Sequence, residues 1–267
     1  MPYLHRPDCR LYYETEGQGP ALVFAHGLGG NHLSWWQQRA YFRGRYTCVT
    51  FAHRGFSPSE SGPDRIGPLG FVDDLAALID HLGLPDVRLV AQSMGGWTCL
   101  GYALREPARV RALVMACTVG TVAHPDIDRV LAAPEYAAAQ AVLVRRNISP
   151  AAGATMEREQ PAQQYLYQAI GRLRIGLDME ATHKILFAMR NTPAAALPAL
   201  TMPVLCISGE EDVLMPTPAI EVLAKLMPRG RLARVPKSGH SVYFERPEIF
   251  NRLVGEFLGE IAGGCGV

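Results

Sequence analysis

VRLVAQSMGGW, the stretch from residue 87 to residue 97, carries the clearest structural signal in this chain. Its first half is an apolar run typical of a buried strand, and a helical pattern follows over residues 94–104. Ser93 stands at the junction, with the small residues Ala91 and Gly95 two positions away on either side. A tight turn from strand to helix needs small neighbours, because the two elements approach each other closely. The stretch therefore predicts a serine hydroxyl exposed beside a helix N-terminus; the alternative is an ordinary N-cap serine.

Similar apolar runs recur along the chain, each bounded by turn residues. Their near-continuous content of Val, Leu, Ile, Phe and Cys is typical of strands buried on both faces of a parallel sheet. Residues 3–17 have instead the pattern of an antiparallel hairpin at the edge of such a sheet. The predicted strands are ALVFAHG (21–27), YTCVTFAH (46–53), VRLVAQS (87–93), VRALVMAC (110–117), PVLCISG (203–209) and GRLARVPKSGH (230–240).

Helical patterns separate these strands. Apolar residues at helical spacing predict helices over residues 67–84, 94–104 and 248–263. Because strands and helices alternate, the sequence predicts an α/β fold with a doubly wound, mostly parallel sheet.

One segment interrupts the alternation. Residues 121–199 contain no convincing strand run, only stretches rich in Ala, Gln, Arg and Leu. A structureless loop of that length is uncommon inside a compact domain. We therefore predict a core made of residues 1–120 and 200–267, with a helical cap inserted at 121–199.

Composition and charge exclude several classes of protein. Of the 267 residues, 48% are hydrophobic and 19% are charged, a balance typical of a folded globular protein. The formal net charge is +1 and no long basic run occurs, so we expect neither a nucleic acid nor a membrane as partner. No run of apolar residues reaches the length of a membrane span.

The cysteines and the motifs that are missing bear on compartment and cofactors. We expect reduced, mostly buried cysteines and no zinc site, because the six are widely spaced: Cys9, Cys48, Cys99, Cys117, Cys206 and Cys265. The first 17 residues lack the apolar centre of a signal peptide, so the sequence predicts a cytoplasmic protein. No His-Glu-x-x-His, Cys-x-x-Cys, nucleotide-binding Gly-x-Gly-x-x-Gly or P-loop motif occurs, and we expect no metal and no cofactor.

Two further motifs, together with residues 87–97, carry a resemblance to a known family. The first buried strand ends in His26-Gly27-Leu28-Gly29-Gly30, and the last two strands are followed by Glu210-Glu211-Asp212 and Ser238-Gly239-His240. From about residue 20 to residue 260, apart from the insertion, the chain resembles the α/β hydrolases. In that family a serine on the strand-to-helix turn is followed in chain order by an acid and then by a histidine.

The resemblance implies a catalytic triad of Ser93, Asp212 and His240. Asp212 is preferred as the acid because the Gly-x-x-Asp pattern after the strand fits the family. Glu210 and Glu211 remain alternatives, although loop glutamates of this kind are usually solvated. The alternative interpretation of His240 is an ordinary surface histidine without a catalytic role.

The resemblance also implies an oxyanion hole formed by the backbone N–H groups of Leu28 and Met94. Acyl transfer needs such donors, aimed at the oxygen on which negative charge develops. His26 is expected to be a structural, hydrogen-bonded side chain. Residues 52–59 are similar to a structural loop of the family, in which Arg54 is expected to form an ion pair.

The expected activity is cofactor-free hydrolysis of apolar, small-to-medium carboxylic esters or lactones through an acyl-enzyme. Four residues are candidates for contact with the substrate: Trp35, Trp97, Phe187 and Arg190. The alternatives are core packing for the aromatic residues and a solvated side chain for Arg190.

Several other functions are compatible with these residues. Hydrolases of carbon–carbon bonds in vinylogous diketone acids often carry Asn before the serine and Trp after the histidine, whereas this chain has Gln92 and Ser241. Thioester hydrolysis and perhydrolysis use the same catalytic groups. A protein that turns over slowly and acts as a ligand sensor is an alternative of another class. The natural substrate and assembly into a homo-oligomer stay open.

Overall fold

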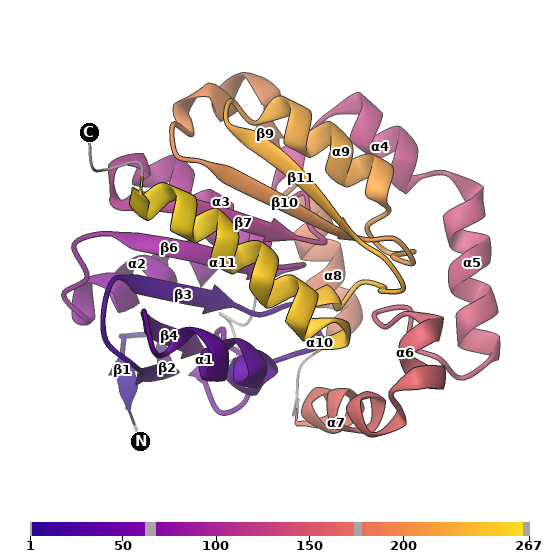
Figure 1. Cartoon of the computed structure of the whole chain (residues 1–267), viewed down its shortest axis with the longest axis horizontal. Coiled ribbons are helices and arrows are strands. Elements are labelled where there is room, and N and C mark those ends of the chain that lie inside the picture. Colours follow the sequence, from indigo (N-terminus) through magenta and orange to yellow (C-terminus); the bar gives the residue numbers. More distant parts are fainter. Residues whose placement is uncertain (1, 62–67, 174–177, 264–267) are drawn as a thin grey trace.

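The computed structural model describes residues 2–61, 68–173 and 178–263, and a nine-stranded sheet lies at its centre (Figure 1). The strands are β1 (Tyr3–His5), β2 (Cys9–Glu16), β3 (Ala21–Ala25), β4 (Thr47–Phe51), β5 (Glu60–Ser61), β6 (Val87–Gln92), β7 (Val110–Ala116), β10 (Val204–Gly209) and β11 (Gly230–Val235). Their order is β1-β2-β4-β3-β6-β7-β10-β11, with β5 paired to β2. β1, β2 and β5 pair in antiparallel fashion, and the neighbours from β4 to β11 are parallel. The predicted mostly parallel sheet and its edge hairpin are confirmed.

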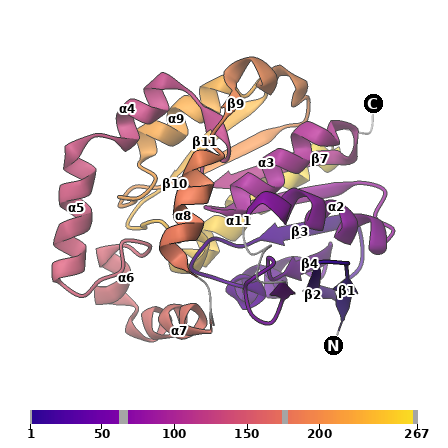
Figure 2. The ribbon, with the colours of Figure 1, turned by 180° about the vertical axis from the view of Figure 1, so that it is seen from behind.

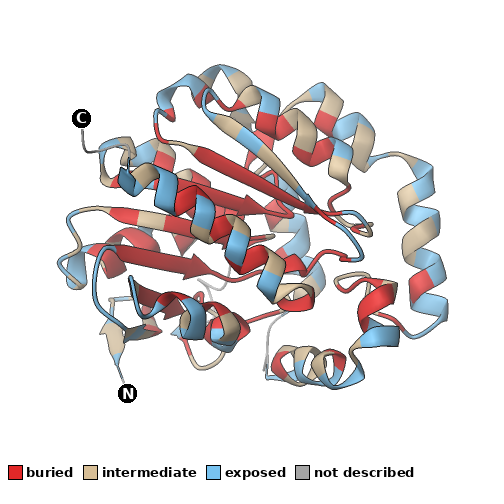
Figure 3. Ribbon diagram, viewed as in Figure 1, coloured by how far each residue is buried: buried red, intermediate tan, exposed pale blue. Residues whose placement is uncertain are grey.

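Strand β3 shows why an almost continuous apolar run forms a central strand here. Alternate side chains of a strand point to opposite faces of the sheet. Leu22 and Phe24 join the hydrophobic cluster on one face, and Val23 and Ala25 join the cluster on the other. All five residues of the strand are buried, so neither face is left for polar side chains (Figure 3).

Helices cover both faces of the sheet. They are α1 (Trp36–Phe42), α2 (Phe71–His81), α3 (Gly95–Arg105), α9 (Thr217–Leu226), α10 (Val242–Glu245) and α11 (Pro247–Gly263). Helices α1 and α11 lie against one face (Figure 1), while α2, α3 and α9 supply apolar residues to the other (Figure 2). The doubly wound arrangement is therefore confirmed, and α2, α3 and α11 match the helices predicted from apolar spacing.

The segment between β7 and β10 is mainly helical and lies beyond the carboxyl ends of the central strands (Figures 1 and 2). It contains α4 (Pro125–Leu131), α5 (Pro134–Arg145), α6 (Ala154–Glu159), α7 (Pro161–Arg172) and α8 (Met179–Ala188). The expectation that it has no strand is wrong in one detail, because β8 (Val122–Ala123) and β9 (Thr192–Pro193) form a two-stranded parallel sheet. Two paired residues are too few for a sequence pattern to predict. The boundaries of core and cap stay a prediction.

Two smaller expectations concern cysteines and membrane spans. Five cysteines are buried and free: Cys9, Cys48, Cys99, Cys117 and Cys206. Cys265 lies outside the described residues. Within the described ranges, no helix has the length and apolar content needed to cross a membrane.

Candidate active site

Ser93 lies on the sharp turn between β6 and α3. Its φ angle of 48° is in the left-handed region, which an L-residue other than glycine adopts only under strain. The turn holds because α3 packs tightly on β3: a Cβ on Gly95 would lie 2.1 Å from the carbonyl oxygen of Ala25. The strained turn exposes the serine hydroxyl at the carboxyl end of the sheet, beside the positive end of the α3 dipole.

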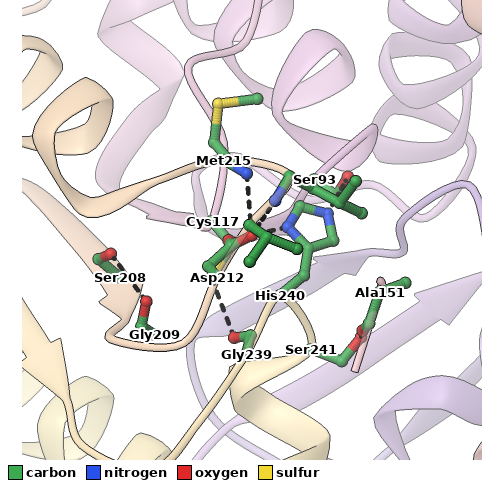
Figure 4. Close-up of polar contacts among 12 residues, drawn as sticks. Ser93, Cys117, Ala151, Ser208, Gly209, Asp212, Met215, Gly239, His240 and Ser241 are labelled. Carbon is green, nitrogen blue, oxygen red and sulfur yellow. Dashed lines mark hydrogen bonds and ion pairs between the residues drawn. The ribbon is translucent and has the colours of Figure 1, made fainter. Parts of the chain in front are cut away.

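His240 connects Ser93 to Asp212 (Figure 4). Its Nε2 atom lies 2.8 Å from Ser93 Oγ, and its Nδ1 atom lies 2.9 Å from Asp212 Oδ2. The three side chains come from the turn after β6, the loop after β10 and the loop after β11, which all lie at the same edge of the sheet. Asp212 and His240 are almost completely buried, so little water competes for these two hydrogen bonds.

The second carboxylate oxygen of Asp212 is held by its own loop. Oδ1 accepts hydrogen bonds from the backbone N–H groups of Leu214 and Met215, at 2.9 and 2.8 Å. Because both oxygens have donors, the orientation of the carboxylate toward His240 is fixed. Of the two alternative acids, Glu211 accepts hydrogen bonds from Thr155, and Glu210 has an exposed side chain. In the described structure, neither forms a hydrogen bond with His240.

The loop after β3 lies directly against the serine turn. A Cβ on Gly27 would be 2.1 Å from Gln92 Oε1 and 3.1 Å from Ser93 Cβ, so glycine permits this close approach. Leu28, the next residue, and Met94 both line the cavity that contains the Ser93 hydroxyl.

His26 is buried and hydrogen-bonded beneath this loop, as expected. Its Nδ1–H donates to the carbonyl oxygen of Gly27, and its Nε2 accepts the backbone N–H of His53. Burial lowers the pKa of His26 to about 3, so the imidazole is neutral at pH 7. Arg54 forms the predicted ion pair: two of its nitrogens lie 2.6 and 2.7 Å from the Asp74 carboxylate.

Two residues that position His240 were missed by the sequence analysis. Gln92 Nε2 donates to the backbone carbonyl of His240 at 2.9 Å. Glu245 is fully buried and accepts N–H groups from Gly239 at 2.9 Å and Ser241 at 3.1 Å, on either side of the histidine. Gln92 is separated from His240 by 148 residues, so no local pattern could reveal its contact.

Glu245 also connects the histidine loop to the inserted segment. The same oxygen that accepts the Gly239 N–H accepts the Gly153 N–H, just before α6, at 3.0 Å. Burial raises the pKa of Glu245 to about 7, and the three backbone donors counteract this by favouring the charged form. The carboxylate therefore holds backbone from two distant parts of the chain.

Cys117, Asp212 and His240 bring three potential metal-ligand atoms together. In the described ranges, the Cys117 sulfur lies within 4.8 Å of ligand atoms of Asp212 and His240. Burial raises the pKa of the Cys117 thiol well above its usual value, and a protonated thiol is a poor ligand. Hydrogen bonds within the site already engage both Asp212 oxygens and both His240 nitrogens. These contacts favour a hydrogen-bonded triad over a metal site.

A cavity of about 580 Å³ opens above Ser93 and His240. Two of the four candidate substrate contacts, Trp97 and Phe187, line it. The Trp97 indole N–H donates to the carbonyl oxygen of Leu186 at 2.9 Å, which links α3 to α8.

The other two candidates require correction. Trp35 is completely buried, and its ring centroid lies 4.4 Å from that of Tyr243 in the core. Arg190 lies outside the cavity lining, because its guanidinium binds the Asp128 carboxylate at 2.7 Å and the Val122 carbonyl at 3.2 Å. Neither residue is in a position to contact a substrate in the cavity.

Comparisons with known proteins agree with this architecture. Residues 22–253 match the model of the alpha/beta hydrolase family. A protein of Azorhizobium caulinodans, provisionally named carbamate hydrolase RutD, is 27% identical over 98% of this chain and 99% of its own length. The 3-oxoadipate enol-lactonase 2 of Acinetobacter baylyi is 37% identical over 46% of this chain and 49% of that protein. A thermophilic esterase from Thermogutta terrifontis, 24% identical, superposes with a TM-score of 0.76 over 95% of this chain and 94% of that one.

Proposed function

Because this chain belongs to the α/β hydrolase family, we propose that it cleaves small-to-medium carboxylic esters or lactones through a covalent acyl-enzyme. The continuous contact from Ser93 Oγ through His240 to Asp212 carries this proposal. The 37% identity to an enol-lactonase over part of the chain supports an ester or lactone bond as the bond that is cleaved. The apolar cavity has a volume typical of small-molecule sites, which supports the size of the substrate.

In the first half-reaction, Ser93 Oγ attacks the carbonyl carbon while His240 Nε2 takes its proton. Asp212 keeps the other proton on His240 Nδ1 and stabilises the imidazolium that forms. The backbone N–H groups of Leu28 and Met94 donate to the oxyanion, and the N-terminus of α3 adds a favourable field. His240 then gives its proton to the leaving alkoxide, which departs as the alcohol.

In the second half-reaction, His240 removes a proton from a water molecule, and the resulting hydroxide attacks the acyl carbon. The tetrahedral intermediate collapses, and the proton on His240 returns to Ser93 Oγ. The carboxylic acid leaves and the enzyme is regenerated without any cofactor.

The substitution Ser93→Ala tests the proposal. We expect the variant to fold, since alanine removes only a hydroxyl, and kcat to fall by roughly 10⁴- to 10⁶-fold. Turnover is measured with a panel of esters, lactones, thioesters and a vinylogous diketone acid, and circular dichroism checks the fold. Near-native hydrolysis by a folded Ser93→Ala protein would rule out Ser93 as the nucleophile.

The same panel separates an enzyme from a ligand sensor. A hydrolase gives steady multiple turnovers, with product in large excess over protein. A burst of one equivalent without further product would contradict the proposal and favour the sensor. A phosphonate ester that labels Ser93 with one equivalent, found by mass spectrometry, would identify the acylated residue.

A further inference from the structure

The cavity above Ser93 has an uneven lining. Around the serine it is apolar, with Leu28, Met94, Trp97, Leu186 and Met215 on its wall. Helix α7 contributes three side chains with polar atoms to the same lining, those of Tyr167, Gln168 and Arg172. The Tyr167 hydroxyl accepts a hydrogen bond from Ser241. Gln168 and Arg172 are four residues apart and therefore lie on the same face of the helix.

Arg172 has no anionic partner in the described ranges of the chain. None of the ion pairs or hydrogen bonds there involves its guanidinium, and no Asp or Glu among the described residues lines the cavity. Arg190, on the same inserted segment, is by contrast neutralised by Asp128. Arg172 is exposed on α7, and it is the one arginine that the described residues contribute to the cavity lining.

The other polar groups of the lining do not compensate this charge. His183 on α8 faces the cavity, and burial lowers its pKa, so it is neutral at pH 7. Gln140 on α5 already donates to the backbone carbonyl of Val213 at 2.8 Å. Among the described residues, the α7 end of the lining therefore carries the uncompensated positive charge of Arg172, and Gln168 adds an amide donor one turn away.

We infer that the natural substrate carries a carboxylate remote from its scissile carbonyl, and that Arg172 binds this carboxylate. A guanidinium presents two parallel N–H groups that match the two oxygens of a carboxylate. Gln168 contributes a further N–H, and the apolar lining contacts the chain between the carboxylate and the ester. This inference rests on the proposed esterase or lactonase activity, whose substrate class it specifies.

Monomethyl adipate and dimethyl adipate test the inference, because they have the same length and differ in one negative charge. We expect the wild-type protein to prefer the monoester. Arg172→Gln lowers kcat/KM for the monoester by about 10- to 100-fold and leaves the diester within about threefold. Arg172→Lys keeps the positive charge but lacks the two parallel N–H groups of the guanidinium, so we expect an intermediate kcat/KM for the monoester. Monoesters of succinate to suberate locate the best spacing.

Arg252→Gln is the matched control, since Arg252 is an exposed arginine of α11 that does not line the cavity. This substitution also removes one positive charge, and we expect it to leave kcat/KM unchanged for both the monoester and the diester. Equal effects of Arg172→Gln on charged and neutral esters at every chain length, or no effect, would overturn the inference.

Binding to the Ser93→Ala protein separates this inference from the proposed activity. Calorimetry with monomethyl adipate needs no turnover, and we expect Arg172→Gln in this background to weaken binding by at least tenfold. If binding depends on Arg172 but the wild type hydrolyses no ester or lactone, the carboxylate site stands and the proposed activity is wrong. If esters are hydrolysed but binding is independent of Arg172, the activity stands and the carboxylate site is wrong.

Discussion

At the scale of single residues, the site depends on side chains whose orientation is fixed by backbone groups. Asp212 receives two N–H donors from its own loop, and its other oxygen faces His240 Nδ1. Only a carboxylate can accept at all these positions at once. The acid therefore selects the histidine tautomer in which Nε2 is free to accept the serine proton.

Asp212→Asn is predicted to lower kcat by about 10⁴-fold, because the asparagine amide favours the wrong tautomer of His240. Glu210→Gln is the matched control two residues earlier, where the side chain is exposed, and it should retain full activity. Both are measured as steady-state rates on one ester at pH 7. Comparable losses in the two variants would argue against Asp212 as the triad acid.

At the scale of elements, a buried ion pair joins the loop after β4 to α2. Arg54 and Asp74 side chains are 4% and 1% exposed, and the guanidinium also binds Asp8 at 2.8 Å. Arg6 also binds Asp74, at 2.9 Å, but its side chain is 22% exposed. Removing Arg54 leaves the buried Asp74 carboxylate with this partly exposed cation as its remaining described ion-pair partner, which costs more than the loss of an exposed pair. The ion pair thus anchors this loop to α2.

Arg54→Leu is predicted to lower the free energy of unfolding by about 3–5 kcal/mol, measured by urea denaturation. Arg105→Leu breaks the exposed pair between Arg105 at the end of α3 and Asp73, the neighbour of Asp74 in α2, and should cost at most about 1 kcal/mol. Equal decreases in the free energy of unfolding for the two substitutions would mean that burial does not determine how much the Arg54–Asp74 pair stabilises the protein.

At the scale of the whole molecule, Glu245 joins the core to the inserted segment through Gly239 and Gly153. Its pKa is raised from 4.5 to about 7 in the folded protein. Between these two pH values the folded state binds more protons at this site than the unfolded state. This residue therefore contributes stability at low pH that is lost as the pH rises toward 7.

Glu245→Gln removes this titration. Relative to the variant, the wild-type free energy of unfolding should fall with rising pH between about 4.5 and 7, by at most about 1.4 kcal/mol per pH unit. Urea denaturation of both proteins across this range gives the difference directly. A difference that does not change with pH would show that Glu245 keeps an ordinary pKa in the folded protein.

A structural feature can be predicted from the sequence when the residues that determine it are close together in the chain. Strands such as β3 and the turn at Ser93 follow from local patterns, because burial on both faces and a close helix approach constrain neighbouring residues. The contact of Gln92 with His240 has no local pattern. Trp35 was misassigned for a related reason: a large aromatic side chain near a loop can turn inward, and only the packing around Tyr243 and Phe24 decides its direction.

The short pair of strands β8 and β9 has a consequence for how such a molecule can diversify. Val122 is paired with Thr192, so a long excursion of the chain leaves and returns at adjacent points. The closure entropy of a flexible excursion grows only slowly with its length. Segments can therefore be exchanged, lengthened or trimmed between these two points while the junctions stay in register. The lining of the cavity can change in this way without changes in the sheet and loops that carry Ser93, Asp212 and His240.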